Sequence, residues 1–177
     1  MRHSSSVRWA KREYLLFGET FPFLYELSPN TQKFTATPDV RPLRLGPWRV
    51  STPICYEDIL PAHVRRMVND GDPHVVVNLT DDVWLGVGQA PWIHFWLAVP
   101  RAVEHRRYLV RATNSGVSAI IDPVGRIVSH TSVGTRANLE GTVRMMSGTT
   151  VYGRFGDWPG WLSLGVVAFM SFRRTAL

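Results

Sequence analysis

The segment 48-WRVSTPICYEDILPAHVRRMVNDGDPHVVVNLT-80 carries a strand, a helix and a second strand in succession. Residues 48–55 have the composition of a strand, and residues 57–69 place Ile59, Val64 and Met67 at helical spacing before the stop signal Gly71. Residues 74–79 are a continuous apolar run, typical of a strand buried on both faces. This order predicts a layered α/β or α+β domain.

The segments that follow extend the pattern. Residues 91–107 form an apolar helical stripe, but Pro100 interrupts it, so we expect a kink or two shorter helices. Short strands are predicted at 108–112 and 117–121, and the turn 122–125 joins the second of these to 126–130 as a hairpin. Residues 21–47 are rich in Pro and Thr and predict an extended connection.

Composition limits the classes of function. A chain of 177 residues that is 45% hydrophobic can bury one core. A net charge of +6 favours acidic partners, but the scattered arginines and the lack of any nucleic-acid motif favour lipid headgroups over nucleic acid. One cysteine excludes an internal disulfide, and six histidines without metal-ligand spacing predict no metal or cofactor.

The C-terminal segment 158-WPGWLSLGVVAFMSF-172 is uncharged and is followed by Arg173 and Arg174. It is shorter than the roughly 20 residues that span a bilayer. Its aromatic start and basic end are nevertheless typical of a membrane interface. Two interpretations stay open, a short transmembrane helix over 158–174 or a buried C-terminal element with a basic tip.

Cys55 is the candidate nucleophile. It lies where the predicted strand meets the predicted helix, and helix N–H groups and the helix dipole favour a thiolate there. The same N–H groups could hold an oxyanion. A buried cysteine that only fills space is the alternative, but the acids Glu57 and Asp58 beside it favour a turn that faces a cavity.

Five blocks of the sequence resemble consecutive blocks of apolipoprotein N-acyltransferases. They are P-I-C-Y-E at 53–57, N-L-T-D-D-V-W-L-G at 78–86, A-P-W-I-H at 90–94, R-A-V-E-H-R-R at 101–107 and R-A-T-N-S-G-V-S-A-I-I-D-P-V-G at 111–125. The resemblance runs from about Lys11 to the C-terminus. It implies that residues 1–157 are the C-terminal portion of a nitrilase-like (carbon-nitrogen hydrolase) α-β-β-α sandwich, incomplete at its N-terminus, and that 158–174 is a candidate transmembrane helix.

The resemblance also implies a chemistry and a location. Such enzymes lie in the bacterial inner membrane with the catalytic domain on the periplasmic side. They take an acyl chain from a phospholipid onto cysteine as a thioester, then transfer it to the N-terminal amine of a diacylglyceryl-cysteine lipoprotein. No cofactor, metal or nucleic acid is implied.

Site residues are carried over by position. Cys55 matches the nucleophile of a Glu-Lys-Cys triad, and Lys11 matches the lysine that precedes an F-G-E block. The Lys11 ammonium and the Tyr56 backbone N–H would stabilise a tetrahedral intermediate. Glu19 and Glu57 match further acids of the family site, which would orient Lys11 and the incoming amine.

The sequence departs from the family pattern in places. The general-base glutamate belongs well upstream of Lys11 and nothing in this chain matches it, which predicts a truncated fragment with little activity of its own. Asp81 replaces the usual Asn, and its charge works against a thiolate. Trp84, Trp92 and Trp96 are interpreted as core residues, with an acyl-chain entrance as the alternative.

Two other functions remain open for the chain as a whole. One is a soluble nitrilase-type amidase that acts on small amides. The other is a catalytically dead half-domain that only binds or assembles.

Overall fold

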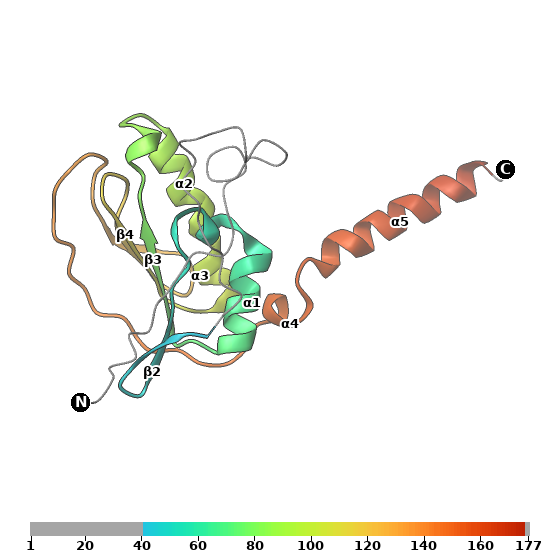
Figure 1. Ribbon diagram of the computed structural model, residues 1–177. Helices are drawn as coiled ribbons and strands as arrows, with labels where there is room; N and C mark the ends of the chain where they lie inside the picture. Colours follow the sequence, from blue (N-terminus) through green and yellow to red (C-terminus); the bar gives the residue numbers. More distant parts are fainter. Residues whose placement is uncertain (1–40, 176–177) are drawn as a thin grey trace, which may run out of the picture.

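The computed structural model describes residues 41–175, which form one mixed sheet with helices (Figure 1). The strands are β1 (Leu43–Leu45), β2 (Trp48–Ser51), β3 (Val75–Thr80), β4 (Leu109–Thr113), β5 (Ala119–Ile121) and β6 (Ile127–His130). The α-helices are α1 (Pro61–Gly71), α2 (Ala90–Ala98), α3 (Pro100–His105), α4 (Val151–Phe155) and α5 (Trp158–Thr175). Two 3-10 turns, η1 (Cys55–Ile59) and η2 (Val83–Leu85), follow β2 and β3.

The six strands lie side by side in sequence order. β2, β3 and β4 are parallel, and hairpins at the two edges add β1 on one side and β5 and β6 on the other as antiparallel strands. The parallel connections pass through α1 and through α2 with α3, so these helices cover one face of the sheet (Figure 1). The predicted layered α/β architecture is therefore confirmed.

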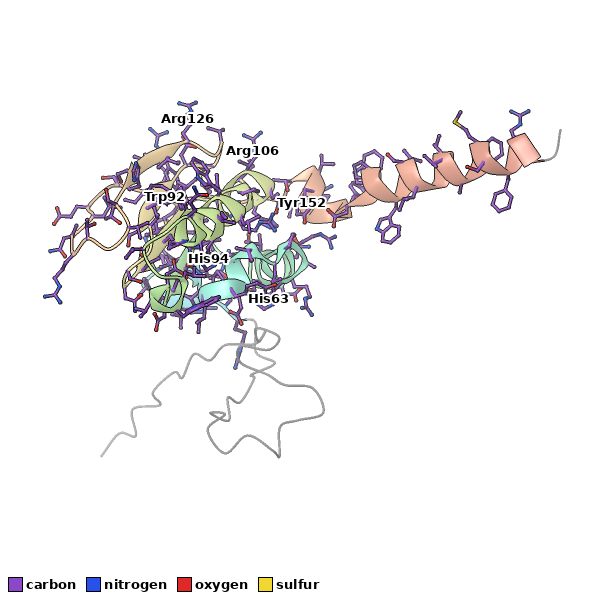
Figure 2. The ribbon with its side chains drawn as sticks, turned by 90° about the horizontal axis from the view of Figure 1, so that it is seen from above. His63, Trp92, His94, Arg106, Arg126 and Tyr152 are labelled. Atoms are coloured by element: carbon purple, nitrogen blue, oxygen red, sulfur yellow. The ribbon has the colours of Figure 1, made fainter. Side chains whose placement is uncertain are left out.

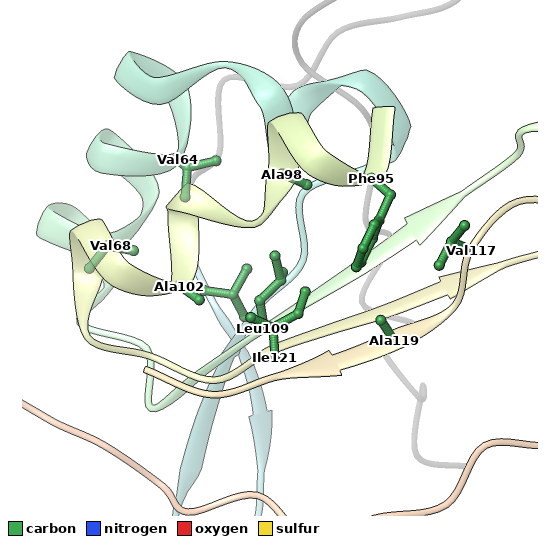
Figure 3. Packing of buried hydrophobic residues seen from close by; sticks show 10 residues of the cluster. Val64, Val68, Phe95, Ala98, Ala102, Leu109, Val117, Ala119 and Ile121 are labelled. Atoms are coloured by element: carbon green, nitrogen blue, oxygen red, sulfur yellow. The ribbon is translucent and has the colours of Figure 1, made fainter. Parts of the chain in front are cut away.

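The core lies between these helices and the sheet (Figure 3). Phe95 of α2 is fully buried, and it packs with small helix residues such as Ala98 and Ala102 above Leu109 and Ile121 of the sheet. Small residues on the helices let their backbones approach the strands closely, so one large ring fills the remaining space.

Two local predictions are confirmed. The helical stripe does break at Pro100, because α2 ends at Ala98 and α3 begins at the proline, whose ring cannot continue a preceding turn. The hairpin at 122–125 also forms, with the Gly125 N–H donating to the Asp122 carbonyl at 3.0 Å.

Two others are wrong in their bounds. The extended connection predicted for 21–47 contains a paired strand near its end, because Leu43–Leu45 pairs with β2 across a turn at Gly46, whose φ is 58°. A three-residue edge strand is too short for an alternation pattern to show. The helix expected from residue 57 begins at Pro61, since proline favours the first helical position and leaves room for η1 before it.

The C-terminal part extends away from the sheet (Figure 1). Arg65 and Asn69 of α1 bind carbonyl oxygens of α4, with Asn69 Nδ2 2.8 Å from the Gly153 oxygen, and this fixes α4 to the domain. α5 follows as an exposed helix. Within residues 41–175, no helix is both long and apolar enough to cross a membrane, so the predicted spanning segment is not confirmed.

Candidate active site

Cys55 lies in a strained turn at the end of the parallel strands. Its φ is 53°, a left-handed conformation that costs a non-glycine residue roughly 1–2 kcal/mol. Ile54 pairs with Leu79 as an isolated bridge, and Asn78 Nδ2 donates to the carbonyls of both Pro53 and Cys55 at 3.1 Å. The buried Asn78 side chain therefore holds the turn in its strained shape from the neighbouring strand.

Glu57 holds the same turn by accepting a backbone hydrogen bond from it. Its side chain is buried, and Oε2 accepts the Ile54 backbone N–H at 2.7 Å and lies 3.8 Å from His63 Nε2. The acid thus acts on the backbone that precedes Cys55. Its suggested contact with an incoming amine stays a prediction.

The helix dipole predicted at Cys55 is smaller than expected. The turn that begins at Cys55 is the five-residue η1, and α1 begins only at Pro61. A helix dipole acts mainly within its first turn. Local N–H groups such as that of Tyr56, at the start of η1, are therefore what could stabilise negative charge at this point.

A second loop faces the sulfur. Cys55 Sγ lies 3.9 Å from the carbonyl oxygen of Asp81, at the end of β3. Asn114 fixes this loop, because Nδ2 donates to Asp81 Oδ1 at 2.8 Å and Oδ1 accepts the Asp82 N–H at 3.1 Å. The Asp81 carboxylate also accepts the Val83 N–H. The hydrogen bond from Asn114, followed by that from Val83, lowers the pKa of the Asp81 carboxyl group.

Four buried side chains join the two loops. Arg111 of β4 contacts the carboxylates of Asp58 and Asp82, the latter at 3.3 Å. His94 of α2 contacts the same two, with Nδ1 2.8 Å from Asp82 and Nε2 3.3 Å from Asp58. Figure 2 shows His94 inside the domain. We call these four residues the buried charge cluster.

Opposing effects act on His94. Burial lowers the pKa of its imidazole, but the contacts with Asp58 and Asp82 raise it, and the net pKa lies above the usual value. The negative charge of Asp82 is matched by Arg111 and His94. The predicted effect of the Asp81 charge on the thiol stays a prediction. The contacts among the four residues are those of an ion-pair network. Within residues 41–175, no group of three His, Cys, Asp or Glu side chains is arranged to hold a metal ion.

An apolar cavity of about 220 Å³ opens beside this site. It is lined by Tyr56, Ile59, Trp84, Leu85, Ala90, Ile93, His94 and Leu97. Trp84 and Trp96 are 59% and 54% exposed, so the interpretation of both as core residues is wrong, because α2 and η2 turn one apolar side outward here. Trp92 does pack against the core, as predicted.

Of the predicted site residues, the structure brings Cys55, Tyr56 and Glu57 together on η1. Lys11 and Glu19 lie outside the described residues. Sequence reasoning assigned no role to Asn78 or to the buried charge cluster. A signal was present, since these polar residues interrupt apolar segments at positions that face the core.

The sequence profile described as Carbon-nitrogen hydrolase matches residues 7–146. The chain belongs to the carbon-nitrogen hydrolase family. Among curated relatives, it is 36% identical to the apolipoprotein N-acyltransferase of Geobacter metallireducens over 93% of the chain and 32% of that protein. It is also 36% identical to that of Methylococcus capsulatus, over 94% of the chain and 34% of the relative. The chain thus spans about a third of the length of these relatives.

Among solved structures, an amidase of the nitrilase superfamily from Nesterenkonia AN1 superposes with a TM-score of 0.45 at 24% identity, over 56% of this chain and 40% of that one. All five sequence blocks quoted above lie in the same domain as Cys55. Four of these blocks contribute a residue to the Cys55 turn, the facing loop or the buried charge cluster.

Proposed function

We propose that Cys55 is the acyl-carrying nucleophile of an N-acyltransferase that moves a fatty acyl chain from a phospholipid to the N-terminal amine of a diacylglyceryl-cysteine lipoprotein. The observation that carries the proposal is the position of the single cysteine. It occupies a left-handed turn, held by Asn78, directly beside an apolar cavity. Strain of this kind persists where the surrounding structure enforces it and is common at reactive sites.

The reaction would run in two balanced steps. The thiolate attacks the ester carbonyl carbon of the phospholipid, the C–O bond breaks, and the lysophospholipid leaves as an alcohol after taking a proton. The acceptor amine then attacks the thioester carbonyl carbon, an amide bond forms, the C–S bond breaks, and the proton lost by the amine returns to the sulfur. Each step passes through an oxyanion that the Tyr56 N–H and the Lys11 ammonium would stabilise.

The apolar cavity suits the acyl part of the donor. Its lining is almost wholly apolar, and Tyr56 connects it to the nucleophile. Each CH₂ group that leaves water for such a site contributes about 0.8 kcal/mol. A small-amide substrate would gain little from this lining, and for that reason we favour the acyltransferase over the amidase.

We further propose that the active protein acts at the periplasmic side of a bacterial inner membrane and that α5, with Arg173 and Arg174 at its end, contacts lipid. Glu19 and Glu57 would orient Lys11. Lys11 and Cys55 would be two members of a Glu-Lys-Cys triad. A base from the region that precedes the matched segment in relatives would supply the third. On this proposal the chain alone reacts slowly.

The test compares two proteins, the chain alone and the chain joined to the upstream region of the Geobacter metallireducens relative. Each is given phospholipid vesicles with a labelled acyl chain and a diacylglyceryl-cysteine peptide. We expect labelled N-acyl peptide from the fusion, far less from the chain alone, and none from either protein with Cys55→Ser. Ammonia release from short amides without peptide acylation would instead establish the amidase, and no product from either protein would favour a binding half-domain.

A further inference from the structure

The buried charge cluster connects the two loops that flank the Cys55 sulfur. Asp58 belongs to η1, three residues after Cys55, and Asp82 follows Asp81, whose carbonyl oxygen lies 3.9 Å from Sγ. His94 and Arg111 each contact both aspartates, so each bridges the loops. All four side chains are at least nine-tenths buried.

The surroundings of His94 favour a protonated ring. Nδ1 lies at hydrogen-bond distance, 2.8 Å, from Asp82, and Nε2 lies 3.3 Å from Asp58, a close charge contact without hydrogen-bond geometry. A neutral imidazole has one N–H, so its other nitrogen would point a lone pair at an ionised oxygen, whereas an imidazolium offers a donor to both. Charge leads to the same answer, because two aspartates and one arginine leave a buried net charge of −1 that a protonated His94 cancels.

We propose that His94 is held as an imidazolium that clamps the Cys55 turn to the Asp81 loop and cancels the surplus negative charge that the two buried aspartates would otherwise place beside the Cys55 sulfur. His94 is thereby a positioning residue for the nucleophile, not a group that touches substrate through a reacting atom. The inference rests on the proposed role of Cys55.

The other charged groups near His94 do not replace this function. Besides Asp58, Asp82 and Arg111, the cavity wall adds the Tyr56 phenol from η1. On α3, which packs against α2, Arg101 and Glu104 pair with each other at 2.7 Å. On β6, His130 contacts the Trp92 ring, with the ring centres 5.7 Å apart. None of these is a second cation within reach of both aspartates.

The test uses the single cysteine as its own reporter. The rate of alkylation by iodoacetamide is measured against pH for the full chain and for His94→Gln, which keeps a donor but loses the charge. We expect the midpoint of the profile to move up by about one pH unit, which lowers the rate about tenfold below the midpoint. His105→Gln, which alters another buried histidine, should match the unchanged chain.

A double variant separates charge from packing. Asp58→Asn together with His94→Gln restores a neutral cluster, so its profile should move back toward that of the unchanged chain. If His94→Gln leaves the profile in place, or if the double variant reacts more slowly than His94→Gln, the inference is wrong.

A measurement without variants covers the case in which His94→Gln does not fold. Ring nitrogen NMR of the unchanged chain should show both His94 nitrogens protonated and the ring mostly charged at about pH 6.5, where an unperturbed histidine is half charged. A neutral His94 there would overturn the inference. Alkylation and NMR report on the thiol and the ring whether or not acyl transfer occurs, so failure of the acyltransferase assay and failure of this inference are distinguishable.

Discussion

Gly116 lies directly against Asp82. A Cβ atom built on Gly116 would stand 2.0 Å from Asp82 Oδ2, a distance that no side chain can accept. Three residues of the segment R-A-T-N-S-G at 111–116 thus act on Asp82. Arg111 pairs with its carboxylate, Asn114 accepts its N–H, and Gly116 leaves room for its side chain. Glycine is required at position 116 because a side chain would have no space there. Its φ is not positive, so backbone conformation is not the reason.

Gly116→Ala is therefore expected to displace Asp82 from Arg111. Overpacking of this kind costs about 1–3 kcal/mol, and we expect a loss of that size in the free energy of unfolding together with slower Cys55 alkylation. Gly88→Ala is the matched control, because a Cβ at Gly88 meets nothing within 4 Å. Equal effects of the two substitutions would show that the contact with Asp82 is unimportant.

Asn78→Asp tests the support of the Cys55 turn. The change keeps the shape of the side chain but replaces the amide that donates to Pro53 and Cys55, so two carbonyls would face a carboxylate. Leaving buried polar groups unsatisfied costs about 1–3 kcal/mol, and the turn should relax, with slower alkylation of Cys55. Asn69→Asp, which alters an amide bound to Gly153, should reduce stability without changing the alkylation rate.

Because the backbone at Cys55 is strained, glycine should stabilise this position more than alanine does, which is the reverse of the usual order. At a φ of 53°, glycine is tolerated without steric cost, so Cys55→Gly should be more stable than Cys55→Ala by about 1 kcal/mol in chemical denaturation. The same pair of substitutions at Ile54, where φ is −107°, should favour alanine. An advantage for alanine at both positions would rule out backbone strain at Cys55.

The lowered pKa of His105 predicts that the free energy of unfolding falls in acid. Burial, followed by the charges of Arg101 and Arg107, lowers the pKa of His105 to about 4. The unfolded chain binds this proton near pH 6.5. Protons therefore favour unfolding as the pH falls from about 6.5 towards 4, by up to about 3 kcal/mol.

His105→Gln should flatten this part of the stability profile, measured by urea unfolding across the same pH range. His130→Gln, at an exposed position, should leave the profile unchanged. A slope that persists in His105→Gln would assign the acid sensitivity to other groups.

Much of the fold follows from local patterns. The apolar run at 74–79 and the break at Pro100 are visible because burial and ring geometry act on neighbouring residues. β1 and the late start of α1 are not visible in this way. β1 depends on pairing with β2, and η1 depends on contacts with β3 and α2 that come from distant parts of the chain.

The candidate nucleophile could be named from the sequence, but the residues that support its turn could not. Cys55 is conspicuous as the single cysteine beside two acids. The meeting of Asp58, Asp82 and His94 requires three elements separated in sequence. The polar residues that interrupt apolar segments are visible in the sequence, but their contact with one another is not. The exposure of Trp84 likewise depends on which side of η2 faces the sheet.

The most direct test of the central claim is peptide mapping by mass spectrometry after the fused protein described above has met phospholipid vesicles with a labelled acyl chain and no acceptor. We predict a labelled, hydroxylamine-sensitive acyl group on the peptide that contains Cys55, and none after Cys55→Ser. Label on another residue, label that persists in Cys55→Ser, or no label at all would contradict the assignment of Cys55 as the acyl carrier.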